Sequence, residues 1–163
     1  MRALRWFLLI LTLVVLQTAL VPSLRIVAGP DLLLVATVAA AYYRGAEVGA
    51  AFGFVAGLAI DCFLASPFGV SALAFCLVGF GVGVFQSGML RSSRLVAPVL
   101  AGVAGLLGGG LWVVVAAIAG QDDLLTGHSA LVVVVAALFD AVVALAVFPF
   151  THWAVGDPDP SRR

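Results

Sequence analysis

Six long stretches of apolar residues, separated by short polar segments, constrain the fold of this chain more than any other feature. The stretches cover residues 6–21, 26–43, 45–65, 68–88, 95–119 and 130–154. An apolar run of about 20 residues can cross the hydrocarbon core of a bilayer as a helix. Because 64% of the 163 residues are hydrophobic and only 10% are charged, a water-soluble domain could not cover so much apolar surface. We therefore predict one all-α domain over residues 1–155, a membrane bundle of about six spans.

The second stretch is the weakest of the six predicted spans. Pro30 interrupts it, and the part from Asp31 to Tyr43 would give only about 20 Å of helix. Two interpretations remain open, a kinked helix that begins near Ile26 and a short helix in a locally distorted bilayer.

The positions of the arginines predict how the spans are oriented. With a cytoplasmic N-terminus, seven of the eight arginines lie on the cytoplasmic side and only Arg25 lies outside. This asymmetry is what the positive-inside rule describes, and an even number of spans then returns the C-terminus to the cytoplasm. Residues 156–163 are rich in proline and predict a disordered cytoplasmic tail.

Small residues recur at every fourth position in the third, fourth and fifth stretches, which places them on one helix face in each. In such a stripe, another helix backbone can approach closely enough for extensive van der Waals contact. One interpretation is packing within the bundle, and the other is a docking face for a helix of another protein; the two are compatible. The predicted packing or partner residues are Gly45, Gly49, Gly53, Gly57 and Asp61 in the third stretch, with Gly79 and Gly83 in the fourth.

Two carboxylates, Asp61 and Asp140, lie inside predicted spans. A charge in hydrocarbon is costly, so such residues normally face the interior of a bundle and mark function. Asp61 continues the glycine stripe, and Asp140 shares a helix face with Ala136 and Ala144. We consider three roles for them: a polar clamp between helices, a proton or solute pathway, and a polar contact with a partner. Candidate hydrogen-bond partners are Gln17, Thr18, Ser71 and Gln86.

No motif for catalysis or for binding a cofactor is present in the sequence. The chain contains no lysine, which excludes the phosphate-binding loop that depends on one. It has neither a GxSxG nor an HExxH motif, and Cys62 and Cys76 have no metal-binding spacing. A net charge of zero gives no indication of nucleic-acid binding. We therefore predict a protein that is not an enzyme, with no catalytic residues, cofactor or metal.

Between Pro30 and Arg91, the chain carries an ordered set of short motifs. They are Pro30-Asp31, Arg44-Gly45, Gly57-x-x-x-Asp61, the outer-corner motif Ser66-Pro67-Phe68-Gly69, and a span that ends in glycines before Arg91. In order and spacing, this stretch resembles the MreD family of rod shape-determining membrane proteins. Outside it, the similarity is limited to length, the number of spans and the placement of charge.

The resemblance implies a multi-pass protein of the bacterial inner membrane that acts as a non-enzymatic scaffold of the cell-wall elongation complex. The family is implied to regulate cell shape and lateral peptidoglycan synthesis together with the bitopic protein MreC, and through it with MreB, RodA and a penicillin-binding protein. On this interpretation, Gly53, Gly57 and Asp61 are expected to matter for assembly. Gly57→Leu is expected to prevent copurification with MreC.

A second function remains open, because the MreD family is similar in fold to the substrate-binding membrane subunits of energy-coupling-factor vitamin transporters. Such a subunit needs a pocket of aromatic and polar side chains near its outer face. The outer segments here offer Asp61, Ser66 and an acidic loop at Asp122 and Asp123, without a rich cluster of that kind. Transport of a small molecule is therefore the alternative prediction.

Overall fold

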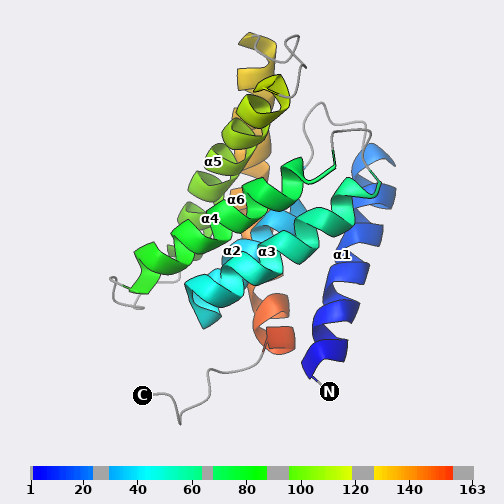
Figure 1. Cartoon of the computed structure of the whole chain (residues 1–163), viewed down its shortest axis with the longest axis vertical. Coiled ribbons are helices and arrows are strands. Elements are labelled where there is room, and N and C mark those ends of the chain that lie inside the picture. The colour runs from blue at the N-terminus through cyan, green and yellow to red at the C-terminus, as the bar shows by residue number, and fades with distance from the viewer. Residues whose placement is uncertain (1, 24–29, 64–67, 88–95, 119–126, 156–163) are drawn as a thin grey trace.

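The computed structural model describes residues 2–23, 30–63, 68–87, 96–118 and 127–155 (Figure 1). Within these ranges all regular secondary structure is α-helical, which confirms the predicted all-α class. Each predicted apolar stretch overlaps one helix. The six helices are α1 (Arg2–Ser23), α2 (Leu32–Arg44), α3 (Ala46–Asp61), α4 (Val70–Ser87), α5 (Val96–Ile118) and α6 (Gly127–Val155).

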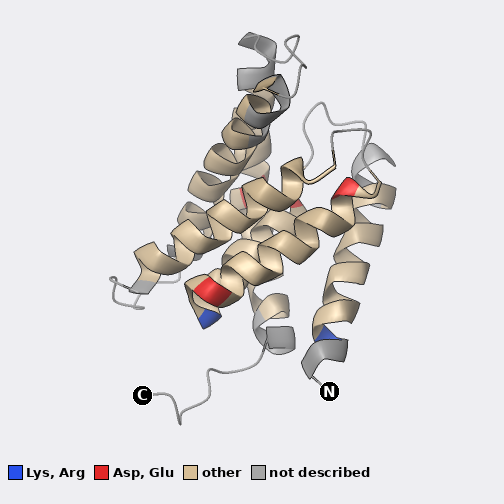
Figure 2. Cartoon of the chain, in the orientation of Figure 1, with Lys and Arg blue, Asp and Glu red and all other residues tan. Residues whose placement is uncertain are grey.

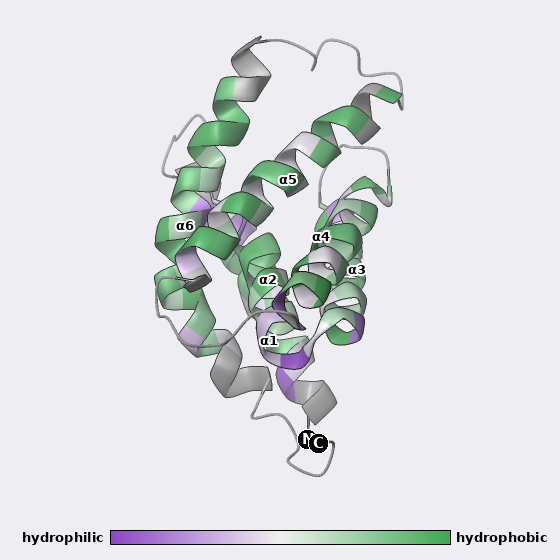
Figure 3. Ribbon diagram, turned by 90° about the vertical axis from the view of Figure 1, so that its left-hand side faces the viewer, coloured by the Kyte–Doolittle hydropathy of each residue, from purple (hydrophilic) through white to green (hydrophobic). Residues whose placement is uncertain are grey.

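The helices run alternately up and down the bundle, so that α1 begins and α6 ends at the same end of the molecule (Figure 1). We call this the basic end, because Arg5 in the first turns of α1 and Arg44 at the end of α2 both lie there (Figure 2). Two antiparallel hairpins form most of the bundle. The α3–α4 hairpin is inclined to α1 and α6, and the α5–α6 hairpin reaches beyond it at the far end (Figures 1 and 3).

Helix α2 lies at the centre of the bundle and contacts all five other helices. Its first ten residues, from Leu32 to Ala41, are all buried. A helix that is apolar on every side belongs in a core. The sequence LLLVATVAAA has one polar residue, Thr37, whose hydroxyl donates to the Leu33 carbonyl of the same helix. The second predicted span, residues 26–43, is therefore a helix of 13 residues that is surrounded by protein, while residues 26–29 lie outside the described ranges.

Aromatic side chains pack between the helices at the basic end of the bundle. Phe148 of α6 packs against Tyr42 and Tyr43 of α2, with ring centroids 5.8 and 6.0 Å apart. On the other side, Trp6 of α1 meets the ring of Phe52 of α3 edge-on at 5.2 Å. The Tyr42–Phe148 pair is tilted and the other two are edge-to-face, and edge-to-face pairs add to the stabilisation from burial itself. These three ring contacts hold α1 against α3 and α6 against α2.

Many large apolar side chains are exposed on the outside of the bundle. Figure 3 shows that hydrophobic residues make up most of every helix. Those exposed by about half or more include Phe7, Phe54, Phe80, Phe85, Val99, Leu107, Leu138 and Val142. Soluble monomers rarely expose apolar surface on this scale, whereas lipid-facing surfaces do. By length and composition, the segment Leu131–Thr151 of α6 can cross a membrane, and shorter apolar helices cover Arg5–Ala19, Leu32–Arg44, Val70–Gln86 and Pro98–Leu111.

Candidate functional site

Asp61 is the last residue of α3, and its side chain is 3% exposed. Its carboxylate accepts hydrogen bonds from the backbone N–H groups of Gly69 at 2.8 Å, Ser71 at 3.3 Å and Ala72 at 3.4 Å. These groups open α4, and the first N–H groups of a helix have no partner within the helix itself. Asp61 therefore caps α4 from the end of α3, in the way that an N-cap side chain does locally.

The outer-corner motif is described only in part, because Ser66 and Pro67 lie outside the described residues. Phe68 is 67% exposed, so its ring points away from the bundle. Gly69 has a φ of +99°, a conformation in which a side chain is strained. This conformation brings the Gly69 N–H to the carboxylate of Asp61. Of the predicted corner motif, Gly69 therefore has a definite structural role.

Asp140 lies in α6 and is 2% exposed. Its Oδ1 accepts a hydrogen bond of 2.6 Å from the backbone N–H of Asp31, the residue that precedes α2. Its Oδ2 faces Gly105 of α5, where an added Cβ would lie 2.6 Å from the oxygen. Asp140 thus occupies the place where α2, α5 and α6 meet, and only glycine at position 105 leaves room for it.

Asp31 is a residue of this site that the sequence analysis did not include among the intramembrane acids. Its Oδ1 accepts hydrogen bonds from the N–H of Leu34 at 3.2 Å and from Nε2 of Gln17 at 3.1 Å. Oε1 of Gln17 in turn accepts from the N–H of Leu33 at 3.3 Å. The signal for Asp31 was present, because an Asp directly before an apolar run is a typical helix N-cap.

Gln17, Asp31 and Asp140 together form what we call the polar cluster, which joins α1, α2 and α6. Gln17 was a predicted partner for a buried acid, and it binds Asp31. Ser71 contributes its backbone N–H to Asp61, whereas the Thr18 hydroxyl donates to the carbonyl of Val14 in its own helix. Gln86 is buried, and within the described part of the chain its Nε2 has no hydrogen-bond partner. Asp31 and Asp140 accept hydrogen bonds from backbone N–H groups at the start of α2. In an apolar surrounding, water cannot supply these acceptors.

The glycine stripe of α3 faces the chain's own helices. A Cβ added at Gly49, Gly53 or Gly57 would collide with backbone atoms of α4, and the same holds for Gly79 and Gly83 of α4 against α3. Gly45 differs, because it lies in the turn between α2 and α3 with a φ of +89° and open space around it. Gly57→Leu would therefore disrupt the α3–α4 hairpin before it could report on contact with a partner.

The described contacts of Asp31, Asp61 and Asp140 are all hydrogen bonds that support the helix bundle. In the ranges that the structure covers, no three His, Cys, Asp or Glu side chains are grouped so that they could hold a metal ion. Cys62 is exposed and Cys76 half-buried, and both are free thiols. What this arrangement does chemically is supply acceptors for the N–H groups that begin α2 and α4.

Comparison with known proteins supplies the identity of the family. A search of curated proteins finds no match, and a search of solved structures finds none either. The predicted likeness in fold to the substrate-binding subunits of energy-coupling-factor transporters therefore stays a prediction. The family model of the rod shape-determining protein MreD matches residues 1–158, which include all six helices. The chain belongs to the MreD family of rod shape-determining membrane proteins.

Proposed function

We propose that this protein is a multi-pass scaffold of the cell-wall elongation complex in the bacterial inner membrane and that it carries out no catalysis. The observation that carries the proposal is the family match over residues 1–158 of a chain of 163 residues. The buried acids are consistent with it, because Asp61, Asp31 and Asp140 accept hydrogen bonds from helix starts. Such a protein would act through the shape of its helix bundle.

The proposed topology has six spans with both termini in the cytoplasm. Two observations support it: seven of the eight arginines fall on that side of the predicted spans, and α1 begins where α6 ends (Figure 1). In this arrangement the basic end, with Arg5 and Arg44, faces the cytoplasm. Residues 1–155 then form the membrane domain, and residues 156–163 form a cytoplasmic tail.

The proposed direct partner is a bitopic protein of the MreC type, and through it MreB, RodA and a penicillin-binding protein. Because Gly49, Gly53 and Gly57 are covered by α4, the surface available to a partner helix is the apolar exterior. The glycines would then affect assembly indirectly, since they set how closely α3 and α4 pack.

A pull-down from native membranes tests the proposal. The tagged protein is solubilised in mild detergent, purified and analysed by mass spectrometry, with an unrelated tagged six-span protein of equal abundance as the control. MreC together with wall-synthesis enzymes should be enriched in the sample over the control. Recovery of an ATPase with energy-coupling subunits, or of a bound vitamin, would instead identify a transporter subunit.

A depletion experiment tests the role in cell shape independently of the pull-down. When expression of the protein is switched off in its own bacterium, the cells should lose their elongated shape over a few generations. Expression of the unaltered chain from a second locus should restore that shape. Cells that keep their shape after the protein is gone would contradict the proposed role.

A further inference from the structure

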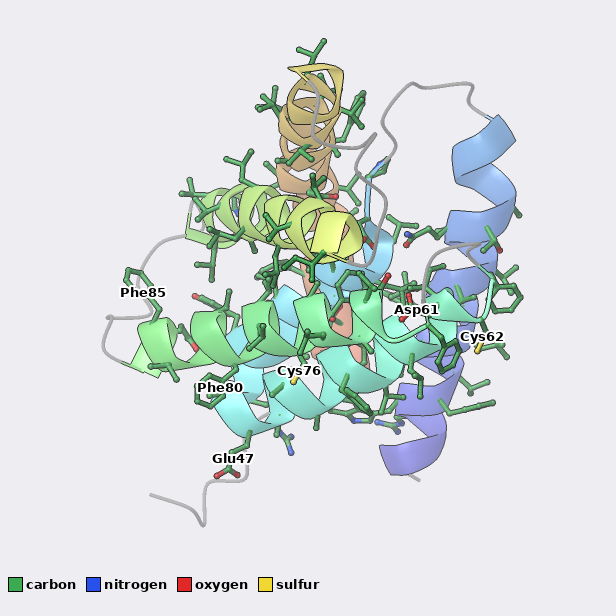
Figure 4. All side chains as sticks on the ribbon, turned by 45° about the horizontal axis from the view of Figure 1, so that its top comes forward. Glu47, Asp61, Cys62, Cys76, Phe80 and Phe85 are labelled. Carbon is green, nitrogen blue, oxygen red and sulfur yellow. The ribbon has the colours of Figure 1, made fainter. Side chains whose placement is uncertain are left out.

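Glu47 is the only exposed acidic residue among those that the structure describes. It lies in the first turn of α3, whereas Asp31 is partly buried and Asp61 and Asp140 are buried. Figure 2 shows Glu47 at the basic end of the bundle, and in Figure 4 its side chain points away from the helices. None of the contacts described for this chain includes its carboxylate. A negative charge therefore faces outward at the basic end.

The face of α3 that carries Glu47 is otherwise apolar. Phe54 lies seven residues after Glu47, which places it on the same helix face, and its side chain is 50% exposed. Ala50 and Ala51 lie between the two, the first half-buried and the second exposed. Such small side chains let a neighbouring helix come close to the backbone of α3.

Phe80 of α4 lies beside Glu47 across the hairpin. Gly79 and Gly83 pack against the backbone at the start of α3, so the residues between them run alongside its first turn. Phe80 is 51% exposed, and Figure 4 shows its ring on the outward side of the hairpin. Leu73, seven residues before Phe80 on the same helix face, is 47% exposed. We call Glu47, Phe54, Leu73 and Phe80 the Glu47 face.

The charge of Glu47 decides which occupant suits this face. In the proposed topology Glu47 lies at the cytoplasmic side, where lipid tails offer no ion partner and anionic headgroups repel a carboxylate. A second copy, related by a two-fold axis along the membrane normal, would bring another Glu47 to the same depth, and like charges oppose that contact. A single membrane span from another protein carries lysine or arginine at its cytoplasmic end, as the positive-inside rule describes. Such a helix supplies the missing positive charge.

We propose that the Glu47 face binds the membrane span of a single-span protein and that Glu47 pairs with a lysine or arginine at the cytoplasmic end of that span. The inference rests on the proposed function, because the bitopic partner proposed there is a protein of this kind. It adds the face on which the partner lies and the charge that orients it. Phe54, Leu73 and Phe80 supply the apolar contacts with the partner helix.

Photocrosslinking in native membranes tests what covers the Glu47 face. The photoreactive residue p-benzoylphenylalanine replaces Phe80 of α4 in one variant and Leu138 of α6, which is 65% exposed, in the other. After irradiation of the cells, the adducts are purified in detergent and the crosslinked peptides are mapped by mass spectrometry. The Phe80 probe should crosslink to the span of a single-span protein that has lysine or arginine at its cytoplasmic end. The Leu138 probe should not.

Two results would overturn the inference. One is a Phe80 probe that crosslinks only to lipid, to a second copy or to a multi-span protein. The other is a single-span protein that crosslinks at Leu138 alone. In either case, a pull-down that still recovers the wall-synthesis proteins would leave the proposed function intact, with the partner on another face. A pull-down that recovers none of them would contradict the proposed function itself.

The charge of Glu47 is tested in the background of the Phe80 probe. Glu47→Gln removes the charge and should lower the yield of the adduct by about threefold or more, whereas Glu47→Asp should retain most of it. Because a first-turn carboxylate also favours its own helix, a charge exchange separates the two roles. Glu47→Arg should abolish the adduct, and glutamate in place of the partner's basic residue should restore it. An unchanged yield in Glu47→Gln, or no recovery in the exchange, would overturn the ion pair.

Discussion

The backbone N–H of Asp31 donates a hydrogen bond of 2.6 Å to Oδ1 of Asp140, across a sequence separation of 109 residues. The bond joins the start of the central helix α2 to the middle of α6. Within a bilayer no water can satisfy a free N–H group, so a side chain must supply the acceptor. Asp140 supplies it, and Gly105 of α5 provides the space beside its second oxygen. The position of the α5–α6 hairpin is thereby tied to α2.

Loss of the Asp140 acceptor should destabilise the bundle. Asp140→Leu leaves the N–H of Asp31 buried without a partner, and we expect a loss of about 1–2 kcal/mol in the free energy of unfolding. Asp140→Asn keeps an oxygen at the same place and should lose less than half as much. Reversible unfolding in mixed detergent micelles measures both. Equal stability of Asp140→Leu and the unaltered chain would show that the hydrogen bond contributes nothing.

Asp61 should stabilise the α3–α4 hairpin through the start of α4. Asp61→Ala removes the acceptor for the N–H groups of Gly69, Ser71 and Ala72, and we expect a loss of about 1–2 kcal/mol. Asp61→Asn retains one acceptor oxygen and should fall between the two. Hydrogen exchange in detergent should also become faster in the first turn of α4 and stay unchanged in α6. Uniformly faster exchange would instead indicate global destabilisation.

Substitution of Gln86 should raise the free energy of unfolding, in contrast to the two substitutions above. Its Nε2 is buried and has no hydrogen-bond partner among the described residues, so no contact described there offsets the cost of removing it from water. Gln86→Met has nearly the same length and removes the unpaired donor. We expect it to raise the free energy of unfolding by about 1 kcal/mol. A clear loss of stability in Gln86→Met would mean that the amide finds an acceptor.

The sequence sufficed to place the helices, because apolar runs bounded by polar residues mark where a helix lies, although α2 is shorter than its predicted stretch. Each of the six predicted stretches overlaps one helix of the structure. The sequence also singled out Asp61 and Asp140, which the structure buries. Burial of Asp61 follows from the periodicity of its stripe, since a residue four positions after Gly57 lies on the same helix face.

The partners of the acids could not be read from the sequence. Asp61 binds N–H groups 8 to 11 residues away, across a turn whose geometry depends on the positive φ of Gly69. Asp31 and Asp140 meet only because α2 and α6 pack together, and no periodicity within one helix carries that information. The same is true of the glycine stripe, whose spacing predicts a close contact without indicating which helix makes it.

Substitution of two glycines of α4, Gly79 and Gly81, can distinguish the effect of close helix packing on stability from the effect of helix propensity. A Cβ at Gly79 would collide with the backbone of Gly49 on α3, whereas a Cβ at Gly81 would meet nothing within 4 Å. Gly79→Ala should therefore force α3 and α4 apart and lower the free energy of unfolding by about 1–3 kcal/mol. Gly81→Ala should be neutral or stabilising by up to about 1 kcal/mol, since alanine favours the helix more than glycine does.

Gly79→Ala and Gly81→Ala are matched controls for each other. Each variant adds one methyl group to α4, and the two positions are two residues apart. Unfolding in mixed micelles gives the two free energies, and the unaltered chain is the reference. A cross-link between α3 and α4 through cysteines placed at their ends should also form more slowly in Gly79→Ala alone. If both variants behave alike, the stripe does not set the distance between these helices, and Gly79 becomes a candidate for contact with a partner instead.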